Sequence, residues 1–228
     1  MSKVTENFEL YLKATESAAI AAAKLRGNGD GKAADKVATE AMRKVLQDSE
    51  VHTRVVIGEG ERDDAPMLYI GEEIGNPESD LKIDIAVDPL ECTNHCAKDL
   101  PDALSVLAAA PRGALLNAPD TYMNKLCGSS KLIGHIALDN SVEDNLSLAA
   151  KALQKNISEL KIIVMDRERH IDLISTLKDL GVQPTVFGDG DVSVGLKAGV
   201  GSFDLLYGVW AGTTKKYYNL GGRAMEAV

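Results

Sequence analysis

Hydrophobic and polar positions in the first fifty residues follow the period of an α-helix. From Ala34 to Leu46 the apolar residues recur three or four positions apart, which predicts an amphipathic helix. Before it, the Ala- and Glu-rich stretch from Thr5 to Arg26 runs into a Gly-Asn-Gly sequence and predicts a first helix with a glycine stop. Two helices are therefore expected before the first strand, which the β-branched run Arg54–Ile57 predicts.

The segment that follows is expected to contain mostly strands. Pro66 favours the start of a helix that would run from Ala65 to about Ile74. Alternation predicts a strand at 81–87, which we expect Asp88-Pro89 to end because proline cannot continue a ladder. Further strands are predicted at 103–110, 114–116 and 132–137.

After Val142 the pattern alternates between helices and strands. This order is typical of βαβ units and a mostly parallel sheet, so the chain is expected to be α/β with an α+β first half. We expect two subdomains, 1–155 and 156–228. The predicted helices are 142–153, 170–180 and 192–198, and the predicted strands are 161–165, 185–187 and 204–207.

Composition restricts the function classes. The 228 residues carry 34 acidic and 25 basic side chains, a net charge of −9, and no Lys/Arg cluster marks a nucleic-acid track. No stretch approaches the ~18 apolar residues of a membrane span, so no membrane insertion is expected. Three cysteines are too few for a disulfide framework. These features predict a cytoplasmic protein, or one in the plastid interior if the source is a photosynthetic eukaryote.

Carboxylates are concentrated where the first two predicted strands end. Glu59 and Glu61 follow the first strand, and Asp88 and Glu91 flank the proline turn of the second. Loops at the carboxyl ends of strands build sites in α/β sheets. Carboxylates gathered there repel one another unless they are protonated or bridged by cations, and hard oxygen ligands select Mg²⁺ or Mn²⁺. The alternative is a set of solvated loop carboxylates.

Cys92 and Thr93 come directly after these carboxylates. A hydroxyl and backbone amides beside metal ions suit phosphate-ester hydrolysis, so phosphoryl transfer is a hypothesis. In the alternative, Thr93 simply caps a helix. A zinc or redox site at Cys92, His95 and Cys96 is a weaker alternative, because a structural zinc site needs four ligands.

Several long segments resemble class II fructose-1,6-bisphosphatases, and most closely the cyanobacterial type that also acts on sedoheptulose 1,7-bisphosphate. The resemblance runs from roughly residue 15 to 208 and includes VVIGEGERDDAPMLYIGEEIG (55–75), IDIAVDPLECTN (83–94), ALSVLAAAPRGALLNAPDTYMNKL (103–126), MDRERH (165–170) and DGDV (189–192). It implies the layered sugar-phosphatase fold shared with inositol monophosphatase, homo-oligomers, and Mg²⁺- or Mn²⁺-dependent hydrolysis of the 1-phosphate of fructose 1,6-bisphosphate.

The resemblance also implies roles for individual residues. Thr93 matches the residue that positions or helps activate the attacking water. The implied metal ligands are Asp35, Glu59, Asp88 and Glu91. The implied substrate-binding residues are Cys92, Tyr122, Arg167, Glu168, Arg169, Asp189, Gly190 and Asp191. Taken without the resemblance, the arginines would be read as surface residues and 189–191 as a turn.

The chain departs from the family pattern in three places. Cys92 stands where the family has glycine, and if that position needs a positive φ the side chain costs roughly 1–2 kcal/mol. Thr214 stands near an expected acidic metal ligand, and family chains continue beyond residue 228, so the second layer is expected to be incomplete. These differences favour, as an alternative, an inactive paralogue that serves as an interaction or structural subunit of a larger assembly. A phosphatase of the inositol-phosphate kind is a third hypothesis.

Overall fold

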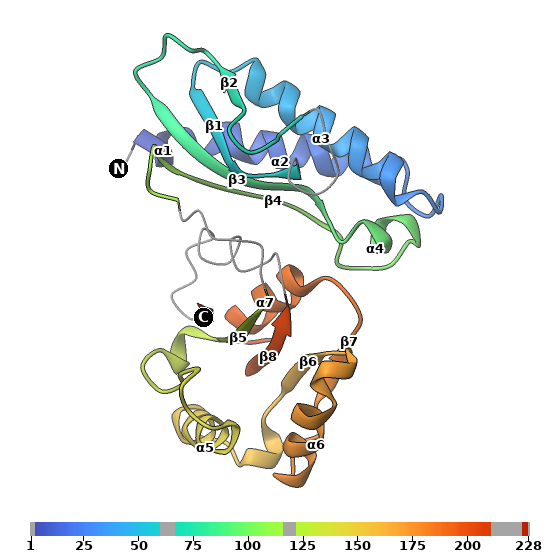
Figure 1. The fold of residues 1–228 in the computed structure, drawn as a ribbon, viewed down its shortest axis with the longest axis vertical. Helices are drawn as coiled ribbons and strands as arrows, with labels where there is room; N and C mark the ends of the chain where they lie inside the picture. Colours follow the sequence, from blue (N-terminus) through green and yellow to red (C-terminus); the bar gives the residue numbers. More distant parts are fainter. Residues whose placement is uncertain (1–2, 60–66, 116–121, 211–224, 228) are drawn as a thin grey trace. The chain divides into compact units, whose positions relative to one another are not determined.

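The structure is a computed structural model that describes residues 3–59, 67–115, 122–210 and 225–227. The chain forms two compact units, residues 1–118 and 119–228 (Figure 1). This division falls earlier than the boundary at 155/156 that the sequence suggested, because residues 123–128 belong to the sheet of the second unit. No helix in the described part of the chain is long and apolar enough to cross a membrane.

Unit 1 consists of a mixed sheet and its helices. The strand order is β2-β1-β3-β4, in which β1 and β3 are parallel and the other pairs are antiparallel. The helices are α1 (Lys3–Glu6), α2 (Phe8–Ala23), α3 (Gly31–Gln47) and α4 (Thr93–Ala97), and the strands are β1 (His52–Ile57), β2 (Glu73–Gly75), β3 (Lys82–Glu91) and β4 (Leu104–Pro111).

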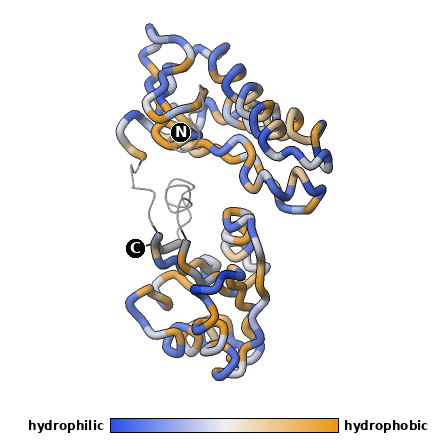
Figure 2. Tube along the Cα trace, turned by 45° about the vertical axis from the view of Figure 1, so that its right-hand side comes forward, coloured by the Kyte–Doolittle hydropathy of each residue, from blue (hydrophilic) through white to orange (hydrophobic). Residues whose placement is uncertain are grey.

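Small residues let α2 and α3 pack closely against each other and against the sheet. Ala14, Ala18 and Ala22 recur every four residues on α2 and are fully buried. Asp30 begins α3 by accepting a hydrogen bond from the Ala33 N–H at 2.9 Å. Both predicted helices are thus confirmed, and the alternation of hydrophobic and hydrophilic residues along them is visible in Figure 2.

Unit 2 is built on a second mixed sheet with the order β7-β6-β8-β5-β9. Strand β6 is parallel to β7 and β8, whereas β5 is antiparallel to β8 and β9. The strands are β5 (Met123–Gly128), β6 (Ile162–Met165), β7 (Thr185–Phe187), β8 (Leu205–Trp210) and β9 (Met225–Ala227); the helices are α5 (Val142–Leu153), α6 (Ile171–Asp179) and α7 (Asp191–Gly199), with short 3-10 turns at η2 (Ser130–Leu132), η3 (Ile157–Glu159) and η4 (Glu168–His170).

Alternation along β6 divides the core of unit 2 between the two faces of the sheet. Ile162 and Val164 join one cluster, with residues of α5 and α6, while Ile163 and Met165 join another, with residues of α7. Helices therefore cover both faces. The α/β class is confirmed, and so are the predicted strands and helices of this half after residue 142.

The predicted helix from Ala65 to Ile74 is wrong over the residues described there, 67–74. That segment turns and then forms β2. Leu68 and Gly71 adopt positive φ angles of 56° and 91°, which no α-helix contains. The buried Glu72 holds the turn, because its carboxylate accepts from Arg43 Nε at 2.7 Å and from the Leu68 N–H.

The strand that was expected to end at Asp88-Pro89 instead continues to Glu91. A bulge in the β3–β4 ladder absorbs the proline, since Asp88 pairs with Val106 and Glu91 with Leu104. The parallel partner β1 no longer pairs there, so the missing proline N–H disrupts no rung.

Two other predicted strands are wrong, and one was missed. Residues 132–137 form a 3-10 turn and a loop, held by the buried Asn145, which bonds both the N–H and the C=O of Ala137. Residues 114–115 of the predicted strand 114–116 are not in a strand, and residue 116 lies outside the described residues. Strand β5 was missed because its buried position 125 is a lysine, which breaks the apolar alternation.

Asp84 is a buried carboxylate of unit 1 with several hydrogen-bond partners. It is only 1% exposed and accepts hydrogen bonds from Arg54 Nε at 3.0 Å and Nη2 at 2.8 Å, and from the Gly113 N–H at 2.7 Å. Arg112 Nε lies 3.0 Å from Asp84 Oδ1 as an ion pair. The Asp84 carboxylate raises the pKa of Arg54, chiefly through these hydrogen bonds. Asp84 therefore ties β1, β3 and the end of β4 together.

Replacing Asp84 by asparagine should destabilise unit 1. The Asp84→Asn variant leaves two guanidinium groups without their buried counter-charge, and we expect the free energy of unfolding to fall by about 3 kcal/mol. Urea unfolding of the full chain measures this. Asp80→Asn, which removes an exposed carboxylate from the same unit, should cost less than about 0.5 kcal/mol. Equal effects of the two variants would contradict the role assigned to Asp84.

Candidate functional site

The register of β1 and β3 brings two predicted ligands to the same edge of the sheet of unit 1. The last pair of this parallel ladder is Ile57 with Ala86. Glu59 and Asp88 each lie two residues beyond that pair. Neighbouring strands are about 4.8 Å apart, so Glu59 and Asp88 follow the end of this ladder on adjacent stretches of backbone, although β3 itself continues to Glu91 beside β4.

Gly58 shapes the loop that carries Glu59. A Cβ atom built on Gly58 would lie 2.0 Å from the carbonyl oxygen of Leu68, so only glycine fits where the chain returns. The Glu59 N–H donates to the same carbonyl at 3.1 Å. The backbone of Glu59 is therefore fixed against residue 68. Glu61, the other carboxylate predicted here, lies outside the described residues.

The exit from β3 has a strained backbone at Cys92. This residue precedes α4 with φ 68° and ψ 58°, in the left-handed region that favours glycine. Its side chain is 9% exposed. The position that was expected to need a positive φ therefore has one. Thr93 is the first residue of α4 rather than its cap, and Glu91 is buried at the end of β3.

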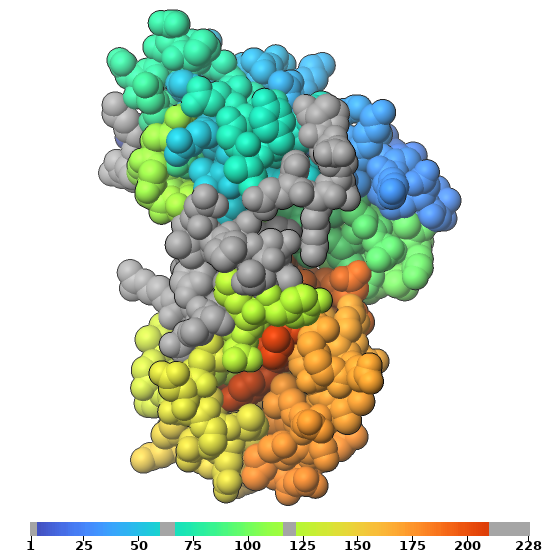
Figure 3. Space-filling model, viewed as in Figure 1, coloured from blue at the N-terminus to red at the C-terminus, as the bar shows by residue number. Residues whose placement is uncertain are grey.

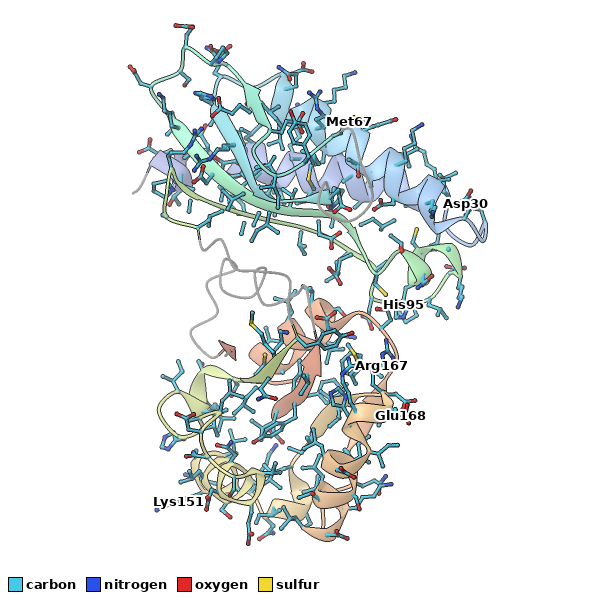
Figure 4. The ribbon with its side chains drawn as sticks, viewed as in Figure 1. Asp30, Met67, His95, Lys151, Arg167 and Glu168 are labelled. Carbon is cyan, nitrogen blue, oxygen red and sulfur yellow. The ribbon has the colours of Figure 1, made fainter. Side chains whose placement is uncertain are left out.

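The loop between α2 and α3 docks on α4 and brings α3 beside Thr93. The N–H groups of Gly27 and Gly29 donate to the carbonyls of Cys96 and Ala97, both at 2.9 Å. A Cβ atom built on Gly31 would lie 3.4 Å from the Thr93 Cβ. Asp30 and His95 mark this end of unit 1 in Figure 4. Asp35 lies one helical turn after Gly31, on the side of α3 that faces Thr93.

The four predicted metal ligands are all carboxylates, whose oxygens suit a hard cation. Nevertheless, the described residues contain no group of three or more His, Cys, Asp or Glu side chains arranged to hold a metal ion. As placed, Asp35, Glu59, Asp88 and Glu91 therefore do not form a closed ligand set.

The alternative zinc or redox cluster also does not form among the described side chains. All three cysteines are free and buried. Cys96 Sγ lies 3.6 Å from the carbonyl oxygen of Ala22, and His95 Nδ1 donates to the carbonyl of Pro101 at 2.7 Å. Cys96 and His95 are thus bonded to the backbone, and no group of metal-ligating residues is found in the described part of the chain.

In unit 2, the predicted substrate-binding residues gather at one edge of the sheet. Strands β6 and β7 end at the pair Met165–Phe187, and the Asp166 N–H donates to the Phe187 carbonyl at 2.7 Å. The segments that follow carry residues 167–169 and 189–191. Tyr122 precedes β5, whose first residue pairs with the last residue of β8. Strands β5 and β8 lie side by side in the ribbon of Figure 1, and in Figure 3 red atoms of the late chain adjoin yellow-green ones.

The two arginines differ in how firmly they are held. Arg169 Nε donates to the carbonyl of Val209, and its guanidinium lies 5.0 Å from the centre of the Tyr122 ring, a cation–π contact. Arg167 Nη1 donates to the adjacent Asp166 carbonyl at 2.7 Å. Arg167 and Glu168 are exposed and lie together after β6 (Figure 4). Forked donors of this type suit a phosphate group.

The Asp-Gly-Asp segment forms the start of α7. Gly190 has φ 84° and its N–H donates to Asp189 Oδ1 at 3.0 Å. Asp191 is the first residue of the helix and is 7% exposed. The segment is therefore both a turn, as in the simpler interpretation, and a helix start that fixes the two carboxylates at the strand edge.

Sequence reasoning missed Lys125 on β5. This lysine is 1% exposed, although lysine is rarely buried without a compensating charge. The pKa of Cys127 is raised to about 12, chiefly by burial and also by the Asp191 carboxylate, while Lys125 acts to lower it, so both charges act in the same part of unit 2. Nothing in the sequence pattern indicated that Lys125 is buried, because a lysine in the middle of 123–128 interrupts the apolar alternation of a strand.

Comparisons with known proteins agree with these motifs. The family model described as bacterial fructose-1,6-bisphosphatase, glpX-encoded, matches residues 6–214. A D-fructose 1,6-bisphosphatase class 2/sedoheptulose 1,7-bisphosphatase of Synechococcus sp. (strain JA-3-3Ab) is 46% identical over 199 residues, which cover 82% of this chain and 57% of the relative. The protein of the same name from Thermosynechococcus vestitus is 44% identical over 81% of this chain and 56% of its own length. The chain thus matches less than two thirds of these relatives.

The backbone strain at Cys92 can be measured with a pair of variants. Cys92→Gly and Cys92→Ala both remove the thiol, but only glycine is relaxed at φ 68°. We expect the glycine variant to be the more stable by about 1 kcal/mol in thermal or urea unfolding.

Cys96 provides the matched control, because it lies inside α4. There the order should reverse, with Cys96→Ala more stable than Cys96→Gly by about 1 kcal/mol. If glycine were also the less stable replacement at position 92, the strain would not exist.

Proposed function

Because the chain belongs to the bacterial, glpX-encoded fructose-1,6-bisphosphatase family, we propose that it is a phosphoric monoester hydrolase that removes the 1-phosphate of fructose 1,6-bisphosphate. Sedoheptulose 1,7-bisphosphate is a second candidate substrate, suggested by the names of the relatives. The observation that carries the proposal is the placement of Glu59 and Asp88 at equivalent positions beyond one parallel ladder, with Glu91 and Thr93 following on the same strand exit.

In this proposal, the residues of unit 1 act in the hydrolysis of the 1-phosphate. The Thr93 hydroxyl orients the water that attacks phosphorus, because a hydroxyl can both accept from and donate to that water. Carboxylates next to it are suited to accept a proton from the water. Since Asp35, Glu59, Asp88 and Glu91 do not close into a ligand set, no step is assigned to a metal ion.

The residues of unit 2 are proposed to bind the distal phosphate and the sugar. Arg167 and Arg169 supply charged donors for phosphate oxygens. Tyr122 holds Arg169 through its ring, and Asp189 and Asp191 accept hydrogen bonds from sugar hydroxyls. Gly190 lets the chain turn into α7. The exposed Glu168 is also proposed to bind substrate, as is the buried Cys92 of unit 1.

Metal dependence is part of the same proposal. We predict a requirement for Mn²⁺ or Mg²⁺ because four acidic residues gathered at a site repel one another and also repel a phosphate ester. A cytoplasmic location and a homo-oligomer, or membership of a larger complex, likewise remain predictions.

One observation favours the rival proposal of an inactive paralogue. Cys92 adopts the left-handed conformation in the position where the family pattern has a glycine. In the rival proposal the chain binds a partner protein and hydrolyses nothing. Phosphate release separates the two.

The test is phosphate release by the full chain with and without added Mn²⁺. We expect turnover of fructose 1,6-bisphosphate that needs the cation. Asp88→Asn should lower kcat/KM by at least about a hundredfold, because it removes a charge at the proposed site without changing the shape of the side chain. Thr93→Ala should cost a comparable factor, and Thr93→Ser should restore most of the activity because it returns the hydroxyl.

Glu78→Gln is the matched control, since it removes one exposed carboxylate from unit 1 outside the proposed site. It should keep kcat/KM within about twofold. Sedoheptulose 1,7-bisphosphate and inositol 1-phosphate are tested in parallel, and turnover of inositol phosphate alone would select the third hypothesis. A folded chain that releases phosphate from none of these substrates would support the inactive paralogue.

A further inference from the structure

His170 occupies a position in unit 2 that the proposed reaction leaves unexplained. It is 1% exposed and is the last residue of the 3-10 turn η4, directly after Arg169. The parallel ladder between β6 and β8 ends at the pair Val164–Tyr207. Beyond that pair, the His170 ring bonds the Met165 carbonyl at 2.7 Å and the Val209 N–H at 2.8 Å. The imidazole therefore joins the two strands where their own pairing has stopped.

These two partners fix the protonation of the ring. The Val209 N–H can only donate, so His170 Nε2 must accept and carries no proton. The Met165 carbonyl can only accept, so Nδ1 carries the proton and donates it. Both nitrogens of the neutral ring are thereby satisfied inside the protein.

Val209 connects His170 to Arg169. Its N–H is held by His170 Nε2, and its carbonyl accepts the hydrogen bond from Arg169 Nε. The same guanidinium lies over the Tyr122 ring at 5.0 Å. Nε is bonded to Val209, the Tyr122 ring lies against the guanidinium, and Nη2 lies 3.9 Å from Met165 Sδ, so Nη1 is the guanidinium nitrogen best placed to donate to an anion. Arg169 is exposed, and an exposed arginine without such anchors would sample many rotamers.

We propose that His170 is a positioning residue that orients Arg169 for a phosphate group, through the Val209 backbone. This inference rests on the proposed function for the identity of the ligand, a sugar phosphate. The orientation of the arginine itself is a property of the ligand-free chain. His170 does not touch substrate in this scheme, so it acts on affinity for the phosphate rather than on the chemical step.

Two amide substitutions separate the two bonds of the ring. In His170→Asn the side-chain amide can replace Nδ1 and bond Met165, but it is too short to reach Val209. In His170→Gln the amide is one methylene longer, and its oxygen and nitrogen can take the places of Nε2 and Nδ1. The two variants thus differ by one methylene group, and only His170→Gln can accept the hydrogen bond from the Val209 N–H.

The first measurement uses the full chain without ligand. In a ¹⁵N NMR spectrum, the Nε–H of Arg169, assigned with Arg169→Lys, should be shifted and protected from solvent exchange. We expect this protection to fall at least about tenfold in His170→Asn and to persist in His170→Gln. An Arg169 signal that is the same in both variants as in the unchanged chain would overturn the inference.

The second measurement is calorimetric binding of fructose 1,6-bisphosphate. His170→Asn should bind about tenfold more weakly, the loss expected for one poorly placed charge-assisted hydrogen bond, and His170→Gln within about threefold of the unchanged chain. In an Arg169→Ala background, His170→Asn should change the affinity less than about twofold, because the two residues act through one path. A tenfold loss that persists without Arg169 would mean that His170 is only structural.

Asn145→Ala controls for stability, since it removes buried hydrogen bonds from α5, which is not part of the proposed site. At a temperature where all variants are folded, it should bind as the unchanged chain does, and a tenfold loss here would overturn the assignment. If the unchanged chain binds no sugar bisphosphate, the proposed function fails, while the ligand-free Arg169 signal still decides the role of His170.

Discussion

Both candidate sites depend on parallel pairing between neighbouring strands. Parallel strands end at the same edge, so whatever follows them in the sequence is brought together in space. In unit 1 the β1–β3 ladder gathers residues that are about thirty positions apart in the chain, Glu59 and Asp88. In unit 2 the β6–β7 ladder gathers Arg167 and Asp189. Helices on one face of the first sheet and both faces of the second fix these ladders in register.

In both units, the chain passes from a strand to the following helix through the same backbone conformation. Each places a residue in the left-handed conformation between a strand and a following helix: Cys92 before α4 with φ 68°, and Gly190 before α7 with φ 84°. This conformation turns the chain sharply and sets the first helical residue close to the strand edge. Glycine adopts it without cost, whereas cysteine pays for its Cβ. Unit 2 thus makes the turn with a relaxed backbone, and unit 1 makes it with a strained one.

The helices and the parallel sheet could be predicted from the sequence, because each depends on a hydrophobic pattern among residues that are close together in the chain. The apolar residues of 34–46 repeat every three to four positions, and β6 is a continuous apolar run, so both were predictable. The helix at 65–74 failed because the turn depends on a positive φ at Leu68 and on the distant Arg43, neither of which a local pattern contains. Resemblance supplied Asp35, Tyr122 and the Asp-Gly-Asp segment. Lys125 was invisible because burial of a lysine is decided by its tertiary partners.

The two strand edges differ in the charged groups that they carry, since arginines stand beside carboxylates in unit 2 whereas the predicted ligands of unit 1 are carboxylates alone. The arginines of unit 2 are held by uncharged partners, the carbonyls of Asp166 and Val209 and the ring of Tyr122, so their positive charge is not cancelled there by an ion pair with those partners. At the edge of unit 1, carboxylates follow both parallel strands, and the chain as a whole carries a net charge of −9. In unit 2 the guanidinium groups can therefore donate to a phosphate group, whereas among the carboxylates of unit 1 a phosphate group needs added positive charge or protonation. Under the proposed function, phosphate binding by the arginines of unit 2 and hydrolysis by the carboxylates of unit 1 should consequently respond separately to divalent cations.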